Sequence, residues 1–226
     1  MNISKSSFAF FICLSLTACQ KQPAQPVDGR AYYQALNCRV CHRIGEEGGR
    51  GGPDLSYVGF RRNREWLNVW LKDPQGWKKD TAMPNPRLSE TARQVLVEYL
   101  LRLKGQAFDQ NTPWNKPLNS VERGHIIYGR AGCIACHGKA GVGGYPNNNV
   151  PGGLIPALNN AAQTFTKEEL KKKIHGGSKP KKADPKGPDP MVFMPAWGKV
   201  LKEDEIDAVS DYLFSLKSKT SQETNW

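Results

Sequence analysis

A five-residue motif that joins two cysteines to a histidine occurs twice in the chain. It reads "CRVCH" at residues 38–42 and "CIACH" at residues 133–137. Four of the six cysteines lie in these motifs, and the other two, Cys13 and Cys19, lie near the N-terminus. No cysteine therefore remains for a disulfide in the body of the chain. The repetition restricts the fold to two alike units, each organised around its own motif.

The sequence around the two motifs is repeated as well. A glycine precedes each motif by nine residues and a tyrosine precedes it by five, and a proline, a methionine and a second tyrosine follow in the same order. The offset between the copies grows along the chain because the second copy carries two added stretches, at 141–153 and 175–190. Their Gly, Pro and Asn content is typical of surface loops. The paired landmarks are Gly29 with Gly124, Tyr33 with Tyr128, Pro53 with Pro156, Met83 with Met194, and Tyr99 with Tyr212.

Each repeat predicts a small helical unit. The stretches 64–73 and 166–176 predict a middle helix in each unit, and no segment shows the alternation typical of a strand. We expect an all-α fold of two tandem domains, at 27–105 and 119–217, joined by a linker at 106–118. The last helix of each unit is predicted from apolar residues at helical spacing: Leu96, Tyr99, Leu100 and Leu103, and then Val209, Tyr212, Leu213 and Leu216.

The N-terminus predicts an export signal at residues 1–19. Lys5 is followed by the apolar run "FAFFICLSLTA", which is too short to span a bilayer. "LTAC" matches the lipobox of bacterial lipoproteins, in which Cys19 becomes the lipid-modified N-terminus; an ordinary signal peptide with a chance cysteine is the alternative. Residues 20–26 then predict a flexible tether, and 218–226 a C-terminal tail.

Three kinds of chemistry use a Cys-x-x-Cys-His motif. A thioredoxin-like pair follows a strand of a βαβ unit, which this chain does not predict. A zinc site needs four ligands, whereas each unit offers only three. In the third interpretation both thiols bond to the vinyl groups of a haem and the histidine ligates its iron. The sequence thus predicts two haem c groups, one on Cys38, Cys41 and His42 and one on Cys133, Cys136 and His137.

Each haem iron offers a second axial position, for which a methionine is the best candidate. Met83 and Met194 stand at matching places in Met-Pro turns, where a thioether sulfur raises the reduction potential of the iron. Packing in the core is the alternative role for these side chains. Met191 could replace Met194 in the second unit, and His125 or His175 could displace a methionine.

The chain carries a formal net charge of +11, of which +10 remains after residues 1–19 are removed. An exported lipoprotein rarely meets nucleic acid, so we expect no nucleic-acid partner and instead docking to an acidic protein or lipid surface. Eight lysines between 167 and 186 are either a solvated face or a docking patch near the second haem. They are Lys167, Lys171, Lys172, Lys173, Lys179, Lys181, Lys182 and Lys186.

These landmarks resemble the class I c-type cytochromes, and the tandem resembles the two-domain dihaem members of that family. The resemblance implies that the first and last helices of each unit cross where the glycine permits close approach and the aromatic residues pack. It also implies that Pro53 and Pro156 each offer a backbone carbonyl to the ring N–H of the haem-ligating histidine. The extended loops of the second unit depart from the minimal family pattern.

The sequence therefore predicts a lipid-anchored dihaem electron carrier on the periplasmic side of the cell envelope. Gln20, rather than aspartate, follows the lipidated cysteine. By resemblance to Gram-negative lipoproteins, this residue favours the outer membrane. The expected electron donor is a quinol-oxidising complex or a dehydrogenase, and the expected electron acceptor is an oxidase or a reductase. A dihaem peroxidase or sulfur-compound oxidoreductase, and a fixed subunit of a membrane redox complex, are the rival interpretations; no catalytic residue is assigned.

Overall fold

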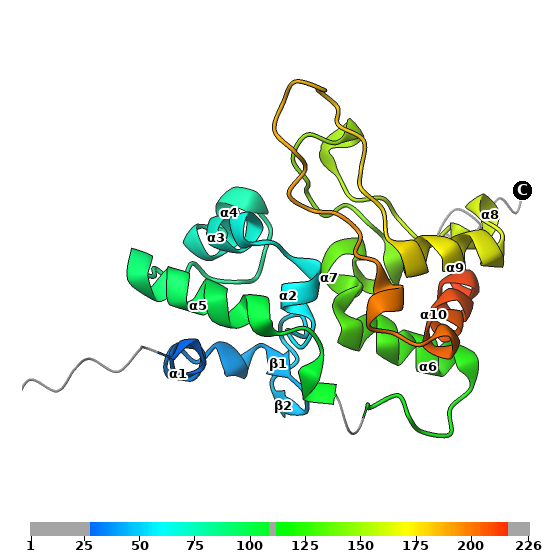
Figure 1. The fold of residues 1–226 in the computed structure, drawn as a ribbon, viewed down its shortest axis with the longest axis horizontal. Coiled ribbons are helices and arrows are strands. Elements are labelled where there is room, and N and C mark those ends of the chain that lie inside the picture. The colour runs from blue at the N-terminus through cyan, green and yellow to red at the C-terminus, as the bar shows by residue number, and fades with distance from the viewer. Residues whose placement is uncertain (1–27, 109–111, 217–226) are drawn as a thin grey trace, which may run out of the picture.

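The computed structural model describes residues 28–108 and 112–216. The predicted signal peptide, lipid-attachment cysteine, tether and C-terminal tail all lie outside the described residues. The described chain forms two helical units side by side, which confirms the predicted all-α tandem fold (Figure 1). The first unit contains α1 (Gly29–Ala35), α2 (Val58–Arg61), α3 (Arg64–Lys72), α4 (Pro74–Trp77) and α5 (Glu90–Arg102). The second contains α6 (Ser120–Ile127), α7 (Ile134–His137), α8 (Ala161–Thr164), α9 (Lys167–Gly176) and α10 (Glu203–Ser215).

One small hairpin in the first unit was not predicted. Strand β1 (Arg43–Ile44) pairs antiparallel with β2 (Glu47–Gly48) directly after the first motif. Two residues per strand are too few to give an alternating pattern in the sequence. No helix in 28–108 or 112–216 combines the length and the apolar character that a bilayer span requires.

Side-chain caps fix where the main helices begin. Asn63 accepts a hydrogen bond from Trp66 N at the start of α3, and Ser89 accepts one from Ala92 N at the start of α5. In the second unit the caps are reciprocal: Asn119 pairs with Glu122 in α6, and Thr166 pairs with Glu169 in α9. These short polar side chains satisfy backbone N–H groups that lack partners inside the helix. The predicted middle helices therefore form close to the residues expected for them.

In each unit the first and last helices cross at the repeated glycine. An added Cβ would lie 2.4 Å from Tyr99 Cβ at Gly29, and 1.8 Å from Ala208 O at Gly124, so only glycine allows this approach. The repeated tyrosines pack beside the crossing, with ring centroids of Tyr128 and Tyr212 5.3 Å apart. The crossing implied by the family resemblance is confirmed in both units. Its strict steric demand explains why the sequence repeats glycine there.

The two added loops of the second unit are joined to each other by three consecutive asparagines. The side chain of Asn147 exchanges two hydrogen bonds with the backbone of Val192, at 2.8 and 3.1 Å. Asn148 and Asn149 make similar contacts with residues 184–191. In Figure 1 these segments rise together above the second unit. The loops thus support each other although their Gly and Pro content excludes regular secondary structure.

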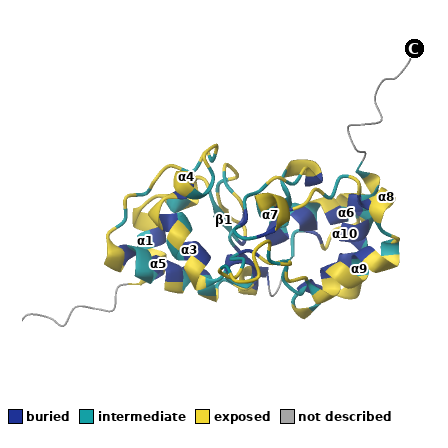
Figure 2. Ribbon diagram, turned by 90° about the horizontal axis from the view of Figure 1, so that it is seen from above, coloured by how far each residue is buried: buried dark blue, intermediate teal, exposed yellow. Residues whose placement is uncertain are grey.

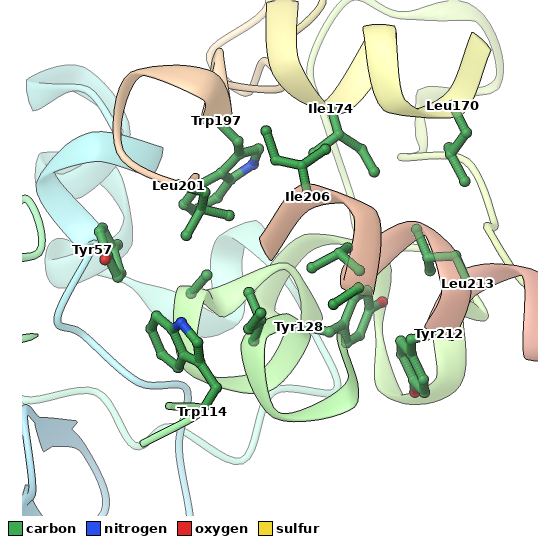
Figure 3. Close-up of a cluster of buried hydrophobic side chains, with 14 of the residues drawn as sticks. Tyr57, Trp114, Tyr128, Leu170, Ile174, Trp197, Leu201, Ile206, Tyr212 and Leu213 are labelled. Carbon is green, nitrogen blue, oxygen red and sulfur yellow. The ribbon is translucent and has the colours of Figure 1, made fainter. Parts of the chain in front are cut away.

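The segment predicted as a linker is anchored in the core of the second unit. Trp114 is 1% exposed, and its Nε1 donates to Glu205 Oε1 at 2.6 Å. Phe108 packs edge-on against it, with ring centroids 5.2 Å apart. Figure 3 shows Trp114 within this core, in the same interior as Leu201 and Ile206.

Each hydrophobic core also extends across the boundary between the units. Tyr57 of the first unit belongs to the core of the second, and its ring lies 5.9 Å from that of Trp197. Conversely, Ile155 and Val192 of the second unit pack with the core of the first. Buried residues accordingly occur inside both units and also where they meet (Figure 2). Shared cores of this kind hold the two units together.

Candidate haem-binding sites

Each Cys-x-x-Cys-His motif forms a helical turn that brings its three side chains together. In the first unit His42 N donates to Cys38 O at 2.9 Å, and in the second His137 N donates to Cys133 O at 2.9 Å. In the second unit, α6 continues through a π-helical turn at Tyr128–Gly132 into α7. Cysteines spaced by three residues on such a turn lie on one face. Both thiols must lie on the same side of the turn to reach the two vinyl groups at the edge of a haem.

The repeated tyrosine of each opening helix secures the end of the motif. Tyr33 donates its hydroxyl proton to His42 O at 3.0 Å. In the second unit Tyr128 donates to Gly138 O at 2.8 Å, one residue further along than the exact repeat would give. Both tyrosines are therefore tied to the backbone where the motif ends. This role explains why each tyrosine stands five residues before its motif in both halves of the chain.

Both motif histidines are oriented by a proline carbonyl, as the family resemblance implied. His42 Nδ1 lies 2.9 Å from Pro53 O, and His137 Nδ1 lies 3.1 Å from Pro156 O. A carbonyl oxygen can only accept, so Nδ1 carries the proton and Nε2 is left with a free lone pair. Burial lowers the pKa of both imidazoles below the ordinary value. At neutral pH the two rings are therefore neutral, which is the state that binds iron.

A cavity of about 570 Å³ lies in the second unit beside its motif. Its walls combine Cys133, Cys136, His137 and Met194 with mostly apolar side chains. The volume falls within the range of roughly 300–1,000 Å³ that is usual for cofactor sites. The predicted attachment residues, the predicted proximal histidine and the predicted sixth ligand thus face one apolar space. These residues fit a covalently held haem, which supplies a one-electron redox centre when bound.

The approach of Met194 to this cavity depends on a pair of backbone hydrogen bonds. Ser178 N donates to Met194 O at 2.9 Å, and Met194 N donates to Ser178 O at 3.0 Å. Gly177, which ends α9 with φ at 70°, leaves room for this pairing, because an added Cβ would lie 2.6 Å from Met194 O. Met191 instead packs against the core of the first unit and does not line the cavity. The choice of Met194 as ligand stays a prediction, with this placement in its favour.

Met83 of the first unit packs in the same hydrophobic cluster as Cys38. Its sulfur accepts a hydrogen bond from Trp70 Nε1 at 3.0 Å. Trp70 lies on α3, and no pattern in the sequence indicated this contact, because tryptophans are common on the apolar face of a helix. Since a thioether sulfur has two lone pairs, one remains for a metal. The predicted ligation of iron by Met83 is compatible with this geometry and stays a prediction.

The other two histidines of the chain lie elsewhere. His125 is exposed on α6 and stacks on Tyr212, with ring centroids 4.9 Å apart. His175 lies near the end of α9, with Nε2 3.3 Å from Glu203 Oε1. Neither side chain lines the cavity of the second unit.

Arg61, which no pattern in the sequence indicated, comes from α2 of the first unit and lines the cavity of the second. Its guanidinium is almost completely buried, with 4% of the residue exposed. A single arginine in a basic chain gives no signal of such a position, because only the docking of the two units creates it.

The fold and these sites define a helical protein built to hold haem through Cys-x-x-Cys-His motifs. The model of the cytochrome c family matches residues 26–104 and 121–217. The chain therefore belongs to the cytochrome c family, whose members transfer electrons through covalently bound haem. This finding agrees with the repeat of two class I units expected from the sequence.

Three similar curated proteins are subunits of cytochrome c oxidases. Cytochrome c oxidase subunit 2 of Alkalihalophilus pseudofirmus is 34% identical over 85 residues, and that of Bacillus subtilis is 31% identical over 94 residues. Subunit CcoP of the cbb3-type oxidase of Azospirillum sp. is 23% identical over 201 residues, which is 83% of this chain. The aligned parts make up only 25%, 26% and 61% of these relatives, respectively.

Proposed function

We propose that this chain is a lipid-anchored electron carrier of the cell envelope that holds two haem c groups. The observation that carries the proposal is the apolar cavity in which the second motif faces Met194. The first unit repeats the motif turn and the histidine–proline hydrogen bond, and Met83 stands at the matching place in its sequence. Neither unit needs a catalytic residue for this function. A single electron enters at one site and leaves at the other toward a partner.

The residues of the chain have distinct roles in this proposal. The four motif cysteines would hold the haems in place, and the proline carbonyls fix the two imidazoles in the tautomer that leaves Nε2 free to bind a metal. Met83 and Met194 would each supply a thioether sulfur to a haem iron, which favours the reduced state. The apolar walls exclude water, which lowers the structural rearrangement that accompanies electron transfer.

The first test concerns the number of haems and their covalent attachment. We expect the mature protein to retain its pigment after acid denaturation and extraction with organic solvent, and its mass to exceed that of the polypeptide by two haem groups. Replacing Cys133 and Cys136 together with alanine should reduce the gain to one, while the first unit serves as internal control. Loss of all pigment on extraction contradicts the proposal. A high-spin signal from one haem in the resting protein would favour the dihaem enzyme instead.

The second test concerns the anchor, which lies outside the described residues. We expect Cys19→Ser to release a soluble, haem-loaded protein into the periplasm or medium, because the lipid is the proposed attachment to the membrane. Ser15→Ala and Ser6→Ala are control variants in the same segment, and each should leave the protein membrane-bound. A Cys19→Ser protein that stays on the membrane without partners contradicts the lipobox assignment.

Partners are proposed to meet the chain through its basic segment. Three of the eight lysines are held by carboxylates of the same chain: Lys167 by Asp211, Lys171 by Asp207, and Lys182 by Asp189. The remaining five are exposed, and among the described residues no ion pair engages them; they are Lys172, Lys173, Lys179, Lys181 and Lys186. A docking role requires electron exchange with an acidic partner to slow as the ionic strength rises.

A fixed subunit of an oxidase is the second candidate, favoured by the names of the three similar proteins. In that case the anchor only holds the chain beside its complex. Purification in mild detergent separates the two candidates, because a fixed subunit should copurify with stoichiometric partners and a carrier should not.

A further inference from the structure

Charged side chains cluster where the two units meet, and those of Asp54 and Arg61 are buried there. Arg130 of the second unit donates from Nε to Asp54 Oδ2 of the first at 2.7 Å, and it also pairs with Glu46. Arg61 Nη2 donates to Asp54 O at 2.8 Å. Asp54 directly follows Pro53, whose carbonyl orients His42. One acidic residue therefore connects the proline that holds the first histidine with arginines from both units.

Arg61 extends from α2 of the first unit to the motif of the second. At Gly132, the residue before Cys133, an added Cβ would lie 2.6 Å from both Nε and Cζ of Arg61. The glycine, with φ at 88°, therefore gives the guanidinium room beside the attachment cysteines. Arg61 Nε is buried without a hydrogen-bond partner among the described residues. Burial lowers the pKa of Arg61, yet an arginine pKa starts so high that its charge is retained at neutral pH.

The charges around the two sites are unequal. Arg62, which is also 4% exposed, lies beside Arg61 and places its guanidinium 5.4 Å from the ring centroid of Tyr145 in the second unit. The residues that line the cavity include Arg61 but neither aspartate nor glutamate within the part of the chain described. On the first side, by contrast, two carboxylates, those of Asp54 and Glu46, pair with the single cation Arg130, and Asp54 directly follows Pro53 in the chain. Positive charge at the second site is thus less compensated than at the first.

We propose that Arg61, supplied by the first unit, raises the reduction potential of the second haem above that of the first, while Asp54 offsets its charge at the first site. This inference rests on the proposed two-haem function. A nearby cation stabilises the reduced iron, which carries one positive charge less, and a water-poor interior strengthens the effect. An electron that enters at the first site then moves to the second, which is reduced as the first is oxidised. The packing of the two units thereby sets the direction of electron transfer within the chain, from the first site to the second.

The test is a potentiometric titration of the holoprotein with Arg61 replaced. In Arg61→Gln we expect the second haem to become harder to reduce, so that the equilibrium constant for transfer from the first to the second site falls about tenfold, or 59 mV for one electron. Arg61→Lys retains the charge and should change the constant by less than about threefold. A Met83→His background identifies the first haem, because exchanging thioether for imidazole lowers its potential. An unchanged second potential in a haem-loaded Arg61→Gln protein overturns the inference.

A second variant applies if Arg61→Gln does not retain both haems. Ser56 N donates a hydrogen bond to Asp54 Oδ1 at 2.8 Å. Asp54→Asn keeps an oxygen acceptor for this bond but removes the negative charge. We expect the first potential to rise and the constant for transfer to the second site to fall about tenfold. An unchanged difference between the potentials overturns the inference. A wild-type protein without two reversible one-electron steps contradicts the proposed function itself, and this is seen before any variant is compared.

Discussion

Met194→Ala is expected to remove half of the methionine–iron charge-transfer band from the oxidised protein and to lower the potential of one haem. Met194 and His137 line the same cavity. In the proposed haem site the iron would then keep only the imidazole as a protein ligand, and the preference for the reduced state that a thioether gives would be lost. Visible absorption of the fully loaded protein, normalised to haem content, measures the effect.

Two further methionine variants serve as comparison for this result. Met83→Ala should remove the other half of the band, because Met83 occupies the matching turn of the first unit. Met191→Ala is the matched control: it lies three residues away in the same loop but packs against the core of the first unit. It should leave the band intact. If Met191→Ala halves the band and Met194→Ala does not, the assignment of the second ligand is wrong.

Trp114→Ala is expected to lower the free energy of unfolding by about 3–5 kcal/mol. The side chain is 1% exposed and fills space between the predicted linker and α10, so its removal leaves a cavity. It also takes away the hydrogen bond to the buried Glu205 carboxylate, which keeps its contact with Lys202 N at 2.8 Å. Guanidinium unfolding of the holoprotein, followed by circular dichroism, measures the loss.

Two variants separate the causes of this effect. Trp114→Phe keeps most of the apolar volume but cannot donate to Glu205, so it isolates the contribution of the hydrogen bond. Lys116→Ala, two residues away and exposed, should change the free energy of unfolding by less than about 0.5 kcal/mol. A Trp114→Ala protein as stable as Lys116→Ala would show that the linker is not anchored through this side chain.

Several features of the site could be predicted from the sequence because they depend on short-range geometry. Both Cys-x-x-Cys-His motifs close a turn from the first cysteine to the histidine, and the carbonyls of Pro53 and Pro156 lie within hydrogen-bond distance of the histidines as the family resemblance implied. Gly29 and Gly124 repeat because no Cβ fits at the helix crossing. The hairpin of β1 and β2 was missed, since two-residue strands leave no pattern.

The sequence by itself determined the helical repeat and the order of landmarks around its motifs, and it predicted the covalent chemistry of those motifs. These properties follow from residue types at fixed spacing, which act locally and in the same way in both halves. Only the tertiary structure decided that Trp114 enters the second core and that Arg61 of the first unit lines the cavity of the second. These contacts depend on how the two folded units pack against each other. The spacing of residues along the chain does not predict which surfaces meet.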